Sequence, residues 1–294
     1  MQTSPLSALS ALPALERDYA SHELSVSVHR RAFRVRAASG RQAFWSRVGA
    51  GQWEPQTFDV FQRFLHPDHS YIDMGAWIGP TVLYGAMLAR RVHALEPDPV
   101  AFSELAGNVM ANPALHHKIQ LYPYGIAPES GPLQLYAGGL YFGEQSQFGD
   151  SMSGMFAAPG AVGQPCREVD AMDLERFLAL NEIDDCNFIK MDIEGGEYAV
   201  IPGLWRRLGS GRLPTLYVSF HAPEPARREA LIRACVDELL LCYPRFYGAM
   251  DAQPVALERA VDAVGDWGDD APGSPWRRLE ILLGAGLVAS HEEW

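Results

Sequence analysis

An acid and two glycines, placed between an apolar run and a stretch with helical periodicity, have the composition of a nucleotide-binding turn. Asp73 precedes Gly75, Ala76 and Gly79, and glycines at such a turn let a ligand approach the backbone closely. Glu96 lies 21 residues after Gly75. That is close to the spacing of about 20 residues at which an acid accepts hydrogen bonds from both hydroxyls of a ribose. The pattern predicts a site for a ribose-containing ligand.

The details of this turn distinguish two classes of ligand. The glycines give G-x-x-x-G and not the G-x-G-x-x-G of a dinucleotide site. Asp73 stands where the pyrophosphate of NAD would be repelled, whereas its carboxylate suits a ligand with a cationic ammonium group. These features favour S-adenosylmethionine over NAD. A tight turn with a capping acid and no ligand is the structural alternative.

Carboxylates gather again around a later apolar run, which ends in Lys190 and Asp192 and is followed by Glu194 and Glu197. Ligands bind at the carboxyl ends of strands in open α/β sheets, and His221 follows the next such run. We expect Asp192 and His221 to be catalytic, with an imidazole pKa in the range useful for a base and Asp192 orienting the ring or binding an acceptor hydroxyl. The same acids and histidine could instead bind a divalent metal. A structural histidine and a Lys190–Glu197 ion pair are the plain alternatives.

Alternating apolar runs and amphipathic stretches predict the elements that position these residues. Strands at 71–74, 91–96 and 119–124, separated by helices at 80–89 and 99–112, form the βαβαβ half of a nucleotide-binding sheet. The remaining elements are expected to be strands at 187–192 and 215–220, weak strands near Phe246 and Ile281, and helices near 171–180, 198–208 and 224–241.

Two segments depart from this alternation. Residues 1–67 are expected to form a tail and a cap, packed on a main domain of residues 68–294. Residues 131–169, which are rich in Gly, Ser and Phe, predict a hairpin followed by a loop. Within it, the flexible segment 149–155, with Tyr141, Phe142 and Phe148 nearby, has the composition of a substrate lid, and a disordered loop is equally consistent.

Charge and composition limit the partners of the chain. Lys and Arg total 24 and Asp and Glu total 36, which gives a net charge of −12. This charge repels phosphate backbones and anionic headgroups, so neither nucleic acid nor a membrane is an expected partner. The four cysteines form no C-x-x-C pair, and residues 1–15 contain no Lys or Arg of the kind found in a secretory signal. We expect a cytoplasmic protein.

Three blocks of this sequence resemble the FkbM family of S-adenosylmethionine-dependent methyltransferases. They are Asp-x-Gly-Ala at 73–76, Glu-Pro at 96–97 and Lys-x-Asp-x-Glu-Gly-x-Glu at 190–197, and the resemblance covers roughly residues 54–221. It implies an α/β fold with a doubly wound, mostly parallel, seven-stranded Rossmann-like sheet. The cofactor would lie across the ends of the first two strands.

The resemblance also implies roles for particular residues. Asp73 and Gly75 would hold the methionine portion of the cofactor, and Glu96 would hold the ribose. Glu54, in a short segment ahead of the first strand, would close over the cofactor. Further cofactor contacts are expected from neighbouring loop residues, which are Ala76, Gly79, Pro97, Tyr124, Gly125 and Ile126.

Two positions differ from the family pattern. Trp77 replaces a polar residue, often Asn, and Ser219 replaces the acid of a Glu-x-His ending. Because the family is associated with O-methylation of small molecules and sugars, we expect methyl transfer to a hydroxyl of a sugar or a secondary metabolite. The alternatives are an NAD-dependent oxidoreductase or epimerase on a similar sheet and a non-catalytic cofactor-binding subunit. The acceptor, the oligomeric state and the need for a metal stay open.

Overall fold

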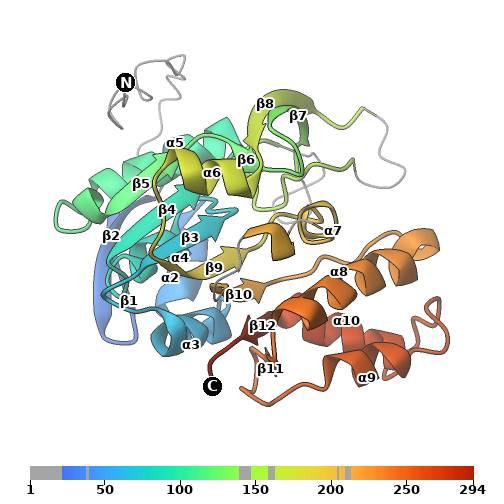
Figure 1. The fold of residues 1–294 in the computed structure, drawn as a ribbon. Helices are drawn as coiled ribbons and strands as arrows, with labels where there is room; N and C mark the ends of the chain where they lie inside the picture. The colour runs from blue at the N-terminus through green and yellow to red at the C-terminus, as the bar shows by residue number, and fades with distance from the viewer. Residues whose placement is uncertain (1–21, 38–39, 139–146, 158–162, 204, 209–212) are drawn as a thin grey trace.

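The computed structural model describes residues 22–37, 40–138, 147–157, 163–203, 205–208 and 213–294 (Figure 1). Its centre is a seven-stranded sheet in the order β11 (Arg245–Gly248), β12 (Leu287–Ser290), β10 (Thr215–Val218), β9 (Cys186–Met191), β3 (Ser70–Met74), β4 (Arg91–Leu95) and β5 (Ile119–Tyr122). β12 is antiparallel to β10 and β11, and the other neighbouring strands are parallel. The predicted seven-stranded, mostly parallel sheet is confirmed.

Helices cover both faces of this sheet, as the prediction of a doubly wound fold requires. One face packs against α2 (Gln42–Gly49), α3 (Pro55–Phe64), α4 (Pro80–Gly85) and α5 (Pro99–Met110). The other packs against α6 (Leu174–Leu180), α7 (Glu197–Val200), α8 (Arg228–Cys242), α9 (Leu257–Asp262) and α10 (Pro275–Ala285). Successive side chains of a strand point to opposite faces. Accordingly, Tyr71 packs in the hydrophobic core on the side of α2–α5, and Ile72 packs in the core on the side of α6–α10. Both side chains are fully buried.

The N-terminal cap is built on an antiparallel hairpin of β1 (His22–Val28) and β2 (Arg31–Ala37). In β2, the buried residues alternate with exposed ones, which places Phe33, Val35 and Ala37 on the inner face. This hairpin packs on α2 and α5 and shares a hydrophobic core with the central sheet. The boundary predicted after residue 67 falls in the loop between α3 and β3.

The insertion contains the predicted hairpin, in which β7 (Gly131–Tyr136) pairs antiparallel with β8 (Cys166–Met172). β6 (Gly125–Ile126) adds a parallel strand to β8, which completes a separate three-stranded sheet. Tyr141 and Phe142, named above as lid residues, lie outside the described residues.

Two predicted elements are wrong in kind or extent. Ile281 lies in α10 and not in a strand, because the side chain of Ser274 accepts the backbone N–H of Arg277 and a proline occupies the first turn. The strand follows this helix, as β12. The helix predicted for 198–208 is divided into α7 and a 3₁₀ turn, η2 (Trp205–Leu208). Pro202, which lies between them, has no N–H to continue the helix.

Other predictions fail only at their boundaries. The helix predicted for 80–89 ends at Gly85, because the N–H groups of Met87 and Leu88 bond carbonyls three residues back and tighten the chain into turns. The helix predicted from Ala171 begins at Leu174, after the end of β8. In the described parts of the chain, no helix has the length and apolar character that crossing a membrane requires.

Candidate active site

A cavity of about 420 Å³ lies at the carboxyl ends of β3, β4, β9 and β10. This volume is within the range usual for sites that bind small molecules. Most of the site residues predicted from the sequence line the cavity, namely Glu54, Gly75, Ala76, Glu96, Pro97, Gly125, Ile126, Asp192 and His221. The fold therefore brings the predicted cofactor loops and the predicted catalytic residues to one space.

Three predicted cofactor residues do not line this cavity. The ring of Tyr124 packs beside Phe177, with centroids 6.2 Å apart. Gly79 lies at the start of α4 with φ 92°, and Asp73 is fully buried behind the cavity wall. Tyr124 is therefore not placed to flank a ligand in the cavity, although the two residues that follow it are.

The glycine turn after β3 is in direct contact with the loop that carries the second acidic cluster. Gly75 has φ 82°, a conformation that only glycine adopts readily. A Cβ atom at Gly75 would lie 1.9 Å from the carbonyl oxygen of Asp192. The backbone N–H of Asp192 donates to the carbonyl of Met74 at 3.1 Å. The close approach of the two loops thus depends on a residue without a side chain.

Replacing Gly75 with alanine is expected to destabilise the protein by about 3 kcal/mol or more, because overlap with a backbone carbonyl adds to the cost of a positive φ. Chemical denaturation measures this change. Gly51→Ala is the matched control, since Gly51 has φ 67° and no atom within 4 Å of its added Cβ. We expect that variant to lose only about 1 kcal/mol. Equal losses in both variants would show that the contact with Asp192 is unimportant.

Glu96 sits at the end of β4 with its carboxylate facing the cavity and only 6% of the residue exposed. One carboxylate oxygen accepts the N–H of Trp77 at 2.7 Å, and the other accepts the N–H of Asp98 at 2.8 Å. Burial, together with the nearby charge of Asp98, raises the pKa of Glu96 to about 8 despite these two hydrogen bonds. The carboxylate is rigidly held, and each of its oxygens keeps a second lone pair for a ligand.

The side chain of Asp73, on β3, is held by a hydrogen bond from α4. Its Oδ2 accepts the hydroxyl of Thr81 at 2.6 Å, whereas its Oδ1 is buried without a hydrogen-bond partner among the described residues. Burial raises the pKa of Asp73, although the positive charge of Lys190 opposes the shift. Thr81 lies between this acid and the cavity and was not predicted as a site residue.

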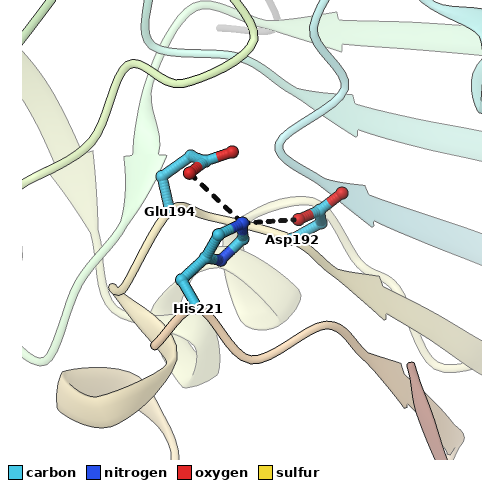
Figure 2. Close-up of side chains that lie close together, drawn as sticks. All are labelled: Asp192, Glu194 and His221. Atoms are coloured by element: carbon cyan, nitrogen blue, oxygen red, sulfur yellow. Dashed lines mark ion pairs between the residues drawn. The ribbon is translucent and has the colours of Figure 1, made fainter. Parts of the chain in front are cut away.

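The acids after β9 and the histidine after β10 come together as the sequence predicts (Figure 2). His221 Nε2 lies 3.2 Å from Glu194 Oε2 and 3.7 Å from Asp192 Oδ1. Its Nδ1 lies 3.3 Å from Oε1 of Glu197, which is fully buried. Lys190 pairs with Asp192 at 2.9 Å, which differs from the Lys190–Glu197 pair considered above.

The charges in this cluster alter the pKa values of its members. Burial alone would lower the pKa of His221, but hydrogen bonds and charges from Glu194 and Glu197 outweigh it and raise the pKa to about 11. This raised pKa lies outside the range useful for a base, contrary to the expectation from the sequence. Burial would raise the pKa of Asp192, but the charges of Lys190 and His221 lower it below its usual value.

Glu54 lines the same end of the cavity from the first turn of α3. It precedes Pro55 and has φ 39° and ψ 53°, a left-handed conformation that costs about 1–3 kcal/mol for a residue with a side chain. Its Oε2 accepts the hydroxyl of Thr57 at 3.1 Å. Burial and the charge of Asp192 raise the pKa of Glu54 to about 7. The N-terminal cap thus contributes an acid to the site.

Within the insertion, the segment 147–157 is described, and its residues 150–155 line the cavity. We call residues 147–155 the roof. The indole N–H of Trp77 donates to the carbonyl of Gly149 at 2.9 Å. Asp98 accepts the N–H of Gly149 and the hydroxyl of Ser153, the latter at 2.9 Å. The predicted lid is therefore tied to both cofactor loops.

Several of these contacts were missed from the sequence. Trp77 was recognised only as a departure from the family pattern, and its bond to the roof was not foreseen. Phe44 and Trp53, from the cap, line the cavity, and the ring of Phe44 lies 4.6 Å from that of Trp77. The closely spaced aromatic residues at positions 44, 45 and 53 are the sequence signal that could have indicated this wall.

A family profile and several solved structures are similar to this chain. No curated protein matches the chain significantly. The solved structures that resemble it include an FkbM methyltransferase from Methylobacillus flagellatus KT, with 17% identity, 64% of this chain and 45% of that chain covered, and a TM-score of 0.39. They also include a precorrin-6y C5,15-methyltransferase from Geobacter metallireducens GS-15, which is 14% identical and has a TM-score of 0.35. The match covers 65% of this chain and 70% of that chain. A SAM-dependent methyltransferase from Agrobacterium tumefaciens is 11% identical and has a TM-score of 0.37. The match covers 75% of this chain and 60% of that chain.

The match to a family profile is more informative than these distant structures. The profile described as "Methyltransferase FkbM domain" matches residues 73–239, which is more than half of the chain. The matched region contains the glycine turn, Glu96, the acids after β9 and His221. In the structural comparison, this chain covers less than half of the FkbM methyltransferase structure named above. By its sequence, the chain belongs to the FkbM methyltransferase family.

Proposed function

We propose that this protein is an S-adenosylmethionine-dependent methyltransferase that acts on a hydroxyl group of a small molecule, such as a sugar or a secondary metabolite. The observation that carries this proposal is that one cavity joins the glycine turn and Glu96 to the Asp192–His221 cluster. A cofactor subsite and an acceptor subsite in one space are what a group transfer requires.

The residues around the cavity fit this cofactor. Gly75 and Gly125 line it without side chains, so that a ligand can reach the backbone. Glu96 offers two fixed oxygens to the two hydroxyls of a ribose. Glu194, together with Glu96, places negative charge where a cationic ammonium or sulfonium group is stabilised. The fit is better than for NAD, because these acids would repel its pyrophosphate.

S-adenosylmethionine, when bound, supplies an electrophilic methyl group attached to a sulfonium. The chain must then align an acceptor oxygen behind that carbon and accept or relay its proton. Asp192 is placed to accept a hydrogen bond from an acceptor hydroxyl, since Lys190 occupies only its Oδ2. His221 holds Asp192 and Glu194 in place from the end of β10.

The proposed acceptor is small and the proposed compartment is the cytoplasm. The net charge of −12 supports a small acceptor over nucleic acid or a membrane surface. The cavity volume of about 420 Å³ leaves little room for a large acceptor beside a cofactor.

Isothermal titration of the purified protein with S-adenosylmethionine, S-adenosylhomocysteine and NAD tests the proposal. We expect micromolar binding of the first two and no binding of NAD. A panel of sugars and hydroxylated metabolites is then incubated with S-adenosylmethionine, and products that gain one methyl group are sought by mass spectrometry. Binding of NAD alone would favour an oxidoreductase. Binding of S-adenosyl ligands with transfer only to amines or thiols would overturn the hydroxyl specificity.

A further inference from the structure

We infer that Asp192, Glu194 and His221 form a binding site for one divalent cation of the Mg²⁺ or Mn²⁺ class, on the acceptor side of the cavity. The inference rests on the proposed function, because the cation would lie where the acceptor hydroxyl is expected. The site combines two carboxylates with an imidazole, and is not a group of acids alone. All three residues line the cavity.

The spacing of the ligand atoms suits such an ion. Ligand atoms about 2.1 Å from Mg²⁺ or Mn²⁺, at right angles to each other, are about 3 Å apart. His221 Nε2 lies 3.2 Å from Glu194 Oε2 and 3.7 Å from Asp192 Oδ1, and the three atoms lie within 4.8 Å of one another. The carboxylates of Glu194 and Asp192 lie on either side of one ring nitrogen of His221, and a dashed line joins each of them to it (Figure 2). Small side-chain rotations would bring the three atoms around one ion.

Neighbouring residues orient His221 and Asp192 in the way that neighbours orient the ligands of known metal sites. Histidines that bind metals use one ring nitrogen and direct the other at a carboxylate or carbonyl, which sets the orientation of the ring. Here Nδ1 faces Glu197 Oε1 at 3.3 Å, which leaves Nε2 toward Asp192 and Glu194. The Oδ2 of Asp192 is held by Lys190 at 2.9 Å, which leaves Oδ1 toward the cluster.

A separate observation concerns Glu197, which is 0% exposed. Its Oε1 accepts the N–H of Ile193 and contacts His221, but its Oε2 is buried with no hydrogen-bond partner in the described part of the chain. A buried carboxylate without full compensation is costly. A cation at Nε2 would take the place of the proton on that nitrogen and leave the Nδ1–H of His221 to donate to Glu197, so this buried carboxylate would keep its partner.

A cation at this position has a role in the proposed reaction. Three protein ligands leave up to three positions of an octahedral ion open, and the cavity lies beside them. An acceptor hydroxyl that occupied one of these positions would be polarised and held at a fixed distance from the methyl group. The bound cation would therefore both align the acceptor hydroxyl and make it more acidic.

Titration of the chelator-treated full chain with Mn²⁺, followed by electron paramagnetic resonance of the free ion, tests the site directly. We expect one Mn²⁺ per chain with micromolar affinity, displaced by excess Mg²⁺. Glu194→Gln and His221→Ala should each weaken this binding about tenfold or more. Glu168→Gln, which changes an exposed glutamate on β8, should leave it unchanged.

S-adenosylhomocysteine affinity, measured on the same samples, separates this inference from the proposed function. A wild-type protein that binds S-adenosylhomocysteine but no stoichiometric Mn²⁺ would overturn the metal site and leave the methyltransferase proposal standing. Mn²⁺ binding without S-adenosylhomocysteine binding would overturn the proposed function. Mn²⁺ binding that Glu194→Gln and His221→Ala leave unaltered would place the ion elsewhere and also overturn the inference.

Discussion

Asp192→Asn is expected to lower kcat for methyl transfer by about 100-fold or more, while S-adenosylhomocysteine affinity stays within about threefold of wild type. Asparagine keeps the shape of the side chain and an oxygen for Lys190, but it loses the negative charge that orients and deprotonates an acceptor. Removing a positioned acid or base typically costs about 10²–10⁴ in rate. Steady-state kinetics with the identified acceptor, combined with calorimetric titration, measures both quantities.

Asp184→Asn is the matched control, because Asp184 is an exposed aspartate that precedes β9 by two residues. We expect it to keep full activity. A fully active Asp192→Asn would remove Asp192 from the reaction, and a thermal melt checks that any loss of activity occurs in a folded protein. His221→Ala should show the same division between turnover and cofactor affinity, because His221 contacts the same acids.

Glu96→Ala is expected to weaken S-adenosylhomocysteine binding by about 10- to 100-fold, because two charge-assisted hydrogen bonds to the ribose would be lost. The wild-type affinity should also depend on pH. The pKa of Glu96 is raised to about 8 in the free protein, and ribose hydroxyls donate better to the ionised carboxylate. Affinity should therefore rise as pH increases from about 6.5 through 8 and level off above it, since below that pKa binding must also remove a proton.

Calorimetric titrations at several pH values measure this effect, and Glu96→Ala should flatten the pH dependence. Glu168→Ala, at an exposed position, should reproduce the wild-type curve. An unchanged affinity in Glu96→Ala would remove the assignment of the ribose to Glu96. A wild-type affinity that does not vary between pH 6.5 and 8.5 would show that the carboxylate is already ionised throughout that range.

Local sequence patterns sufficed for the centre of the fold. The βαβαβ unit, the hairpin of the insertion and the strands that carry Asp192 and His221 were predicted because apolar runs and turn residues act over short distances. The juxtaposition of Asp192 and His221 was also predictable, since parallel strands present their carboxyl ends at one edge. Ile281 was placed in a strand because its apolar neighbours outweighed the helix-start signal at Ser274 and Pro275.

Features that depend on contacts between distant segments could not be read in this way. The sequence predicts acids near His221, but it does not show that Glu194 and Glu197 face its two ring nitrogens, so the direction of the pKa shift of His221 was not foreseeable. Likewise, Thr81 separates Asp73 from the cavity only because α4 returns over β3. Such effects arise from burial and charge, which a spacing rule does not contain.

The attachment of the roof has a consequence for protein engineering. The roof belongs to the insertion between β7 and β8, a segment that an engineer would exchange between related enzymes to change the acceptor. Its anchors, Trp77 and Asp98, lie outside that segment, in the cofactor loops. A chimera that receives a foreign insertion must therefore receive matching residues at positions 77 and 98, and a graft of this insertion must take Trp77 and Asp98 with it.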